Sequence, residues 1–218
     1  MDNPYGDFVH EVWEEFPQLA EWHNLDNDIL PIWKLEQFIE AGYHNFDADR
    51  KPLYHLSRMI ENYAQEHKEP LLATFEKIAK FSYVKERYQK MVKDMPKVWI
   101  IADFDDEVIP TDVVIPNSEF LSCSNTNLAN VWTVITRGPY GPFGLIAEEY
   151  EDGKFRGFFT LNSNVCRYAL KVMGATLDAK FVLLQLRNSE FGIITSVGIT
   201  SSSKSAIIHT FGISVTIF

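Results

Sequence analysis

Hydrophobic residues near the start of the chain recur with the spacing of a helix. Within residues 7–22, Phe8, Val12, Phe16 and Leu19 lie three or four positions apart. Side chains with this spacing share one helical face, so the pattern predicts an amphipathic helix. The apolar face either packs on the rest of the domain or contacts a partner, and packing is the more common use of such a stripe.

Four more helices are predicted further along the chain. A short one covers Trp33–Ala41, and longer ones cover Leu53–His67 and Ser82–Met95, each with apolar positions in helical register. A fourth begins at Asn162 or Ser163, whose side chains are suited to capping the first turn. The helices therefore occur in both halves of the chain.

Short β-branched and aromatic runs between these helices predict strands. Leu71–Phe75 and Lys97–Ala102 (KVWIIA) flank the helix over 82–95, and a crossover of that length makes two strands parallel. Residues 151–153, Glu-Asp-Gly, predict a hairpin turn between later strands. The further strand candidates are Val113–Ile115, Val131–Thr136, Phe143–Glu149 and Phe155–Thr160.

These elements predict an α/β fold with an α+β-like second half: a mixed β-sheet flanked by helices, with an N-terminal helical extension. The expected divisions are the extension, residues 1–50, a main domain over 51–176, and a β-like or truncated tail over 177–218. Asn45–Pro52 is polar and is interpreted as a linker. Residues 191–218 contain a single formal charge, so they are either two more strands or a truncated or frame-shifted end.

Composition narrows the choice of partners. The chain has 218 residues and a formal net charge of −10. This charge repels phosphate backbones and anionic lipid, so neither nucleic acid nor a membrane is expected as a partner. Two cysteines form no disulfide framework and match no zinc-binding pattern. A cytoplasmic location is therefore expected.

The acidic run that follows the KVWIIA strand is the strongest candidate for chemistry. Asp103 and Asp105 follow the carboxyl end of a predicted strand, which is where ligand sites commonly occur in α/β sheets. Their spacing resembles the nucleophile loop of haloacid-dehalogenase-type phosphatases. In that interpretation Asp103 attacks phosphorus, Asp105 acts as acid and base, and Mg²⁺ assists. The glycine and threonine that continue the loop in that family are missing, and a solvated acidic turn is the alternative.

Two further residue classes have a structural and a functional interpretation. Cys166 near the capped helix is either a reactive thiolate or a small core residue. The aromatic residues either line a pocket for a planar ligand or fill the core. They are Tyr83, Tyr88, Trp99, Trp132, Phe155, Phe158 and Phe159.

Five short motifs follow one another over about Leu53–Met173. They are Leu56–Glu61 (LSRMIE), Pro70–Glu76 (PLLATFE), Arg87–Tyr88, Trp132–Ile135 and Phe155–Thr160 (FRGFFT). Their order resembles the DICT sensory domain, which is named for its occurrence with diguanylate cyclases and two-component systems. Glu76, Val131 and Lys154 depart from that family's pattern. If these positions contact a ligand, a different ligand is expected here.

The resemblance implies a non-enzymatic input module of bacterial signal transduction that binds a small molecule and acts on an output domain or partner protein. It names no catalytic residue, no metal and no cofactor. A phosphohydrolase using Asp103 and Asp105, and an interaction scaffold that dimerises through residues 7–22, are the alternatives. The candidate ligand contacts are Arg58, Glu61, Glu76, Arg87, Trp132 and Arg156.

Overall fold

The computed structural model describes residues 7–17, 42–104, 109 and 115–181. By its internal contacts the chain divides into two units, Met1–Leu186 and Arg187–Phe218, and the description below concerns the first. Three predictions fall outside the described residues: the helix over 33–41, most of the strand over 113–115, and the character of the segment 191–218.

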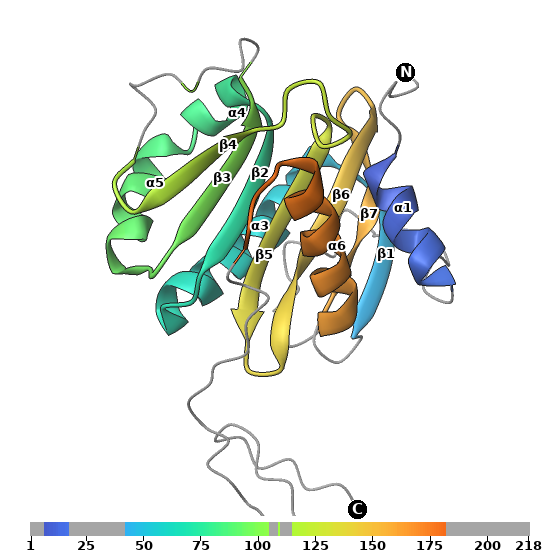
Figure 1. Ribbon diagram of the computed structural model, residues 1–218, viewed down its shortest axis with the longest axis horizontal. Coiled ribbons are helices and arrows are strands. Elements are labelled where there is room, and N and C mark those ends of the chain that lie inside the picture. Colours follow the sequence, from blue (N-terminus) through green and yellow to red (C-terminus); the bar gives the residue numbers. More distant parts are fainter. Residues whose placement is uncertain (1–6, 18–41, 105–108, 110–114, 182–218) are drawn as a thin grey trace, which may run out of the picture. The chain divides into compact units, whose positions relative to one another are not determined.

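The described part of the chain forms one seven-stranded sheet in the order β1-β7-β6-β5-β2-β3-β4 (Figure 1). Neighbours β2, β3 and β4 are parallel, whereas β5 joins β2 antiparallel and starts an antiparallel set with β6, β7 and β1. This arrangement confirms the predicted α/β fold with an antiparallel second half. The strands are β1 Tyr43–Asp49, β2 Leu71–Lys77, β3 Val98–Asp103, β4 Ser118–Ser122, β5 Val131–Gly138, β6 Gly141–Glu151 and β7 Lys154–Thr160.

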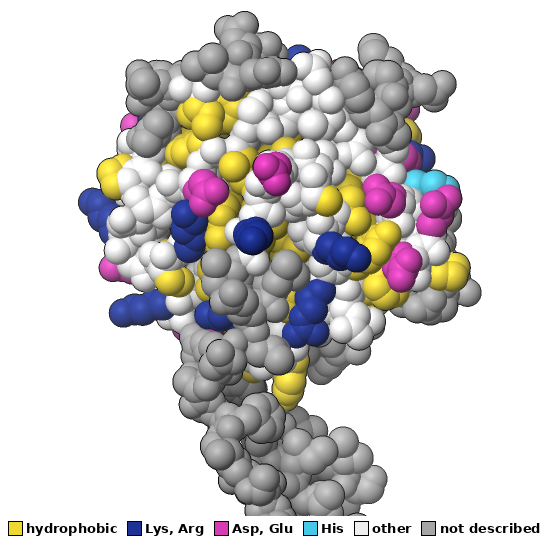
Figure 2. Space-filling view, viewed as in Figure 1, with side chains coloured by type: hydrophobic (Ala, Val, Ile, Leu, Met, Phe, Trp, Pro, Cys, Tyr) yellow, Lys and Arg dark blue, Asp and Glu magenta, His cyan; other side chains and the backbone are white. Residues whose placement is uncertain are grey.

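Helices cover both faces of the sheet. One face carries α3, α4 and α5, and the other carries α1 and α6 (Figure 1). Figure 2 views the α6 face, where basic and acidic side chains lie among exposed hydrophobic ones. The helices are α1 Phe8–Glu15, α3 Arg50–His67, α4 Ile78–Ser82, α5 Lys85–Met91 with a 3₁₀ turn over Val92–Asp94, and α6 Ser163–Thr176.

The pleat of each strand divides its side chains between two cores. On β5, Val134 packs in the cluster under α3, while Val131 and Ile135 pack in the cluster under α6. On β7, Phe155 and Phe159 join the α3 cluster. Most predicted aromatic candidates, including Trp99 and Tyr88, are fully enclosed core residues of one cluster or the other.

The interpretation of Asn45–Pro52 as a linker is wrong. Residues 43–49 form edge strand β1, which pairs antiparallel with β7 along its whole length, and Arg50 then begins α3. Buried Phe46 and Ala48 stand among polar residues, and one of these, Asn45, is itself buried and accepts from Trp13, so the segment looks polar in sequence. A half-buried edge strand needs apolar residues on one face only, which is why composition concealed it.

Two other element predictions needed revision. The helix expected over Ser82–Met95 begins only at Lys85, as α5 followed by a 3₁₀ turn; Ser82 instead ends the separate helix α4, and Tyr83 and Val84 connect the two helices. Strand β4, Ser118–Ser122, was not predicted; it pairs parallel with β3 and carries a single buried residue, Phe120. A strand with one buried position leaves little periodic signal.

Residues at both ends of the described chain pack into the sheet's core. Helix α1 buries Phe8, Val9, Val12 and Trp13 against the α6 face, so the predicted packing role of its apolar stripe is confirmed. At the other end Phe181 packs edge-on against Trp99, with ring centroids 5.7 Å apart. The core thus draws on residues assigned from sequence to the N-terminal extension and to the tail.

The packing of α1 against the sheet predicts that its buried residues contribute to the free energy of unfolding. Phe8→Ala is expected to lower the free energy of unfolding by about 3–5 kcal/mol, because it removes a fully enclosed ring and leaves a cavity. His10→Ala on the exposed side of the same helix is the control and should change little. Urea unfolding measures both. Equal, small effects would show that α1 does not cover the sheet in solution.

Candidate ligand pocket

A pocket of about 550 Å³ opens on the α3 face of the sheet. Helix α3 forms one wall, α4 and the start of α5 form the opposite wall, and β2 and β5 form the floor. Its volume lies in the range of small-molecule sites. The lining residues are Arg50, Lys51, Tyr54, Ser57, Glu61, Thr74, Phe75, Glu76, Lys80, Tyr83, Val84, Arg87, Trp132 and Val134.

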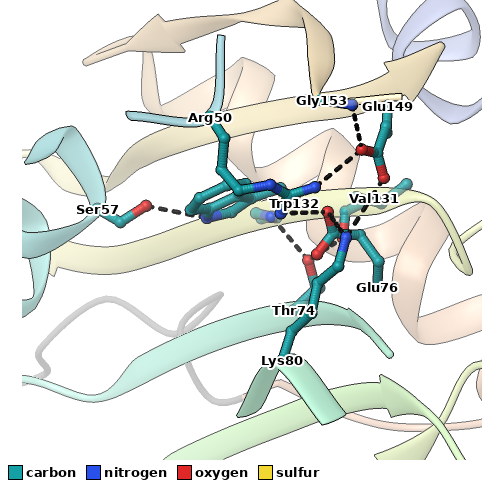
Figure 3. Close-up of polar contacts among 10 residues, drawn as sticks. Arg50, Ser57, Thr74, Glu76, Lys80, Val131, Trp132, Glu149 and Gly153 are labelled. Carbon is teal, nitrogen blue, oxygen red and sulfur yellow. Dashed lines mark hydrogen bonds and ion pairs between the residues drawn. The ribbon is translucent and has the colours of Figure 1, made fainter. Parts of the chain in front are cut away.

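An interruption between β2 and β5 lies at the floor of the pocket. Their backbone ladder ends at the pair Ala73–Val134. Beyond that pair the Thr74 hydroxyl accepts from the Thr133 amide at 2.7 Å and donates to the Val131 carbonyl at 2.5 Å. The side chain thus satisfies β5 backbone groups where the β2 backbone no longer does. Polar side chains gather beside this point (Figure 3).

Four charged side chains form a closed network beside Thr74. Arg50 donates to Glu76 at 3.0 Å and to Glu149 at 2.8 Å, and Lys80 contacts the same two carboxylates at 2.8 and 3.4 Å. Figure 3 shows both cations directed between the two acids. Two positive and two negative groups balance, so the nearly buried Glu76 carboxylate has two cationic partners inside the fold.

Aromatic rings hold Arg50 in place. Its guanidinium carbon lies 5.4 Å from the Trp132 ring centroid and 4.8 Å from that of Phe155. The Trp132 indole donates to the Ser57 hydroxyl at 3.0 Å, which connects β5 to α3 (Figure 3). Stacked and hydrogen-bonded in this way, Trp132 is a fixed wall of the pocket.

A second polar group lies at the α5 side of the pocket. The Glu61 carboxylate is buried, accepts from the Tyr88 hydroxyl at 2.7 Å and pairs with Arg87. Arg58 Nε approaches the same carboxylate at 3.8 Å. Burial raises the pKa of Tyr88, and burial lowers the pKa of Arg87 from its usual value. Two guanidinium groups therefore share one carboxylate here.

The mouth of the pocket is aromatic. Tyr54 on α3 is 40% exposed, and Tyr83 in the α4–α5 connection is 90% exposed. Together with Phe75 and Trp132 they give the pocket apolar walls between the two charged groups. A cavity of this kind suits a molecule with a planar apolar body.

The predicted contacts do not all converge. Glu61, Glu76, Arg87 and Trp132 line the pocket, and Arg58 lies immediately beside it. Arg156 lies on the opposite face of the sheet, where it pairs with Asp7 at the start of α1. Neighbouring positions on a strand point to opposite faces. Arg156 therefore lies on a strand of the sheet, but its side chain points away from the pocket.

Sequence reasoning missed three of the four members of the charge network beside Thr74. Arg50 was assigned to a linker, Lys80 to no predicted element, and Glu149 only to the end of a strand. Of these, Lys80 could have been found, because Glu76 and Lys80 are four residues apart across a strand-to-helix junction. Arg50 and Glu149 are 99 positions apart and meet only in the folded chain.

The other candidates for chemistry lie away from the pocket. The Asp103 carboxylate accepts from the Ser124 hydroxyl at 2.5 Å, and Asp105 falls outside the described residues. The phosphohydrolase alternative therefore stays a prediction. Cys166 is enclosed in the α6 core, and burial raises the pKa of its thiol to about 12, as expected for a small core residue.

The described residues contain neither a group suited to hold a metal ion nor a helix suited to cross a membrane. Across residues 7–17, 42–104, 109 and 115–181, no three His, Cys, Asp or Glu side chains are grouped as metal ligands would be. No helix in those ranges has both the length and the apolar composition needed to cross a bilayer. Comparisons of the chain with protein-family models, with curated proteins and with solved structures find no match.

The charge network makes a pH-dependent prediction. Burial raises the pKa of Glu149, but the Gly153 amide, Lys80 and Arg50 outweigh it and lower that pKa from its usual 4.5. A lowered folded-state pKa stabilises the fold above the unfolded value, and this contribution is lost as pH falls through the folded value. Glu149→Gln should therefore cost about 1–2 kcal/mol at pH 7, and less as pH falls below about 4.5.

Urea unfolding of both proteins from pH 7 to pH 3.5 measures this difference. Glu151→Gln, at an exposed position of the same strand, is the control and should behave like the unmodified chain. A destabilisation by Glu149→Gln that stays constant down to pH 3.5 would contradict a charged role for this carboxylate.

Proposed function

We propose that this chain is a ligand-binding sensory module that acts on an output domain or partner protein. The observation that carries the proposal is the pocket between α3, the α4–α5 wall and the sheet. Its polar side chains are held by one another before any ligand enters, through the Arg50 network, the Glu61 group and the Trp132–Ser57 bond. Such preorganisation lowers the cost of ordering the site on binding.

The position of the pocket supports a signalling role. A molecule seated there would contact α3 on one wall, and α4 and α5 on the other, with the sheet beneath. Helices α4 and α5 are short and are separated by an exposed connection at Tyr83. A ligand that binds better when these walls are close would shift the population toward that arrangement, and an attached or associated partner could respond.

The wider setting belongs to the same proposal. The resemblance to the DICT domain remains a prediction and agrees with an input role in bacterial signalling. The free, buried thiols of Cys123 and Cys166 fit a reducing cytoplasm. A homodimer remains an alternative mode of output, although the apolar side of α1 is already used within the chain.

A neutral fluorescent probe tests the ligand pocket. N-phenyl-1-naphthylamine should bind saturably at one site, with increased emission, and should slow amide hydrogen exchange in α3 and in α4–α5. Val134→Phe should weaken binding about tenfold or more, because Val134 lines the pocket and a larger ring would occupy it. Fluorescence titration and exchange mass spectrometry provide the two readouts.

Val172→Phe is the matched control, since it makes the same substitution on α6 at the opposite face. It should leave binding unchanged, and circular dichroism should show both variants folded. If the probe fails to bind, or binds Val134→Phe as well as the unmodified chain, the pocket is not a ligand site and the proposal fails.

A further inference from the structure

A second depression adjoins the pocket. It measures about 370 Å³ and has two residues, Tyr83 and Arg87, in common with the pocket's lining. The two hollows therefore meet at one shared wall, formed by the α4–α5 connection and the first turn of α5. The second hollow is lined by Arg58, Asn62, Gln65, Tyr83, Glu86, Arg87, Lys90 and Met91.

Charge is distributed unequally between the two ends of this combined site. At the inner end, Arg50 and Lys80 are balanced by Glu76 and Glu149. The second hollow is lined by the basic side chains of Arg58, Arg87 and Lys90 and by the carboxylate of Glu86, and Arg58 and Arg87 both approach the Glu61 carboxylate. Three cations against two anions leave a local positive excess, in a chain whose formal net charge is −10.

One nitrogen beside the shared wall, on Arg58 of α3, is left without a hydrogen bond. Arg58 Nε is buried and has no hydrogen-bond partner, because the Glu61 oxygen at 3.8 Å is beyond hydrogen-bond reach. The other contact of this guanidinium is a long one, 3.5 Å, to the Tyr54 hydroxyl. A guanidinium whose hydrogen bonds are long or unmade gains from an incoming acceptor that reaches its exposed nitrogens. Charge-assisted bonds to a guanidinium are the strong ones.

Lys51 adds a further cation at the mouth of the pocket. It stands one residue after Arg50 and is exposed, and among the described residues no carboxylate pairs with it. Its charge adds to the positive field that an approaching anion meets. The adjacent walls are aromatic, with Trp132 and Phe75 inside and Tyr83 at the rim.

We infer that the ligand is a planar aromatic anion. Its ring lies in the pocket between Trp132, Phe75 and Tyr83, and its acidic group reaches the shared wall and accepts from Arg58 and Arg87. The inference rests on the proposed ligand-binding function and adds the chemical class of the ligand. A carboxylate, sulfonate or phosphate would each supply the acceptor oxygens that the guanidinium groups need.

A pair of probes that differ by one group tests the inference. 8-Anilino-1-naphthalenesulfonate has the same ring system as N-phenyl-1-naphthylamine and adds a sulfonate. The sulfonate probe should bind the unmodified chain about tenfold more tightly, since a charge-assisted hydrogen bond contributes about 1.5–3 kcal/mol. Raising the salt concentration should narrow this gap.

Charge-removing variants locate the acidic group. Arg58→Gln should weaken binding of the sulfonate probe about tenfold, with the neutral probe unchanged. Lys51→Gln should produce a smaller change in the same sense, and it removes no ion pair from the described fold. Lys171→Gln on α6, at an exposed site of the opposite face, is the matched control and should affect neither probe.

The two proposals fail in different ways. If both probes bind with equal affinity, Val134→Phe weakens both, and neither Arg58→Gln nor Lys51→Gln discriminates between them, the pocket is a ligand site but the inference of an anion is wrong. If sulfonate binding survives Val134→Phe, the anion binds elsewhere and the inference is also wrong. If Val134→Phe leaves the affinity for the neutral probe unchanged, the proposed function itself fails.

Discussion

The arrangement of the α3 face depends on keeping charged side chains stable inside the fold. Glu76 and Glu61 are nearly inaccessible to solvent, and an unpaired carboxylate in such a place would cost several kcal/mol. Each has cationic partners: Glu76 of β2 pairs with Arg50 of α3 and Lys80 of α4, and Glu61 of α3 pairs with Arg87 of α5 and with Arg58, three residues earlier on its own helix. The helices must therefore lie where these cations reach the two buried carboxylates.

The same constraint explains why a pocket forms at this point. The β2–β5 ladder stops after Ala73, and Thr74 completes the hydrogen bonding of the β5 backbone in its place. The charged network occupies the adjacent position, so the helices are joined to the sheet there by polar contacts rather than by close apolar packing. Between the two polar groups, Trp132 and Phe75 line open space. A hollow with fixed walls is the result.

The opposite face of the sheet shows a different solution. Helices α1 and α6 cover it largely through apolar contacts, including Phe8, Trp13 and Val165, and both cysteines are enclosed there. Arg156 and Asp7 fasten the start of α1 at the edge of this face. The protein thus combines an apolar face that stabilises the fold with a polar face that leaves room for a ligand.

Local pattern was enough to determine most elements of this protein. The apolar runs of β2, β3, β5, β6 and β7, the register of α3, and the Asn162 cap of α6 are each encoded within a few neighbouring residues. The alternation of β1 was too weak to recognise, because its polar residues outnumber Phe46 and Ala48. The candidate site was also predictable only in part: Glu61, Glu76, Arg87 and Trp132 belong to motifs that can be recognised along the chain. Only the tertiary structure shows that Arg50 pairs with Glu149 and that Arg156 lies on the face opposite the pocket. Both depend on the order in which the strands pair, and no short stretch of sequence contains that order.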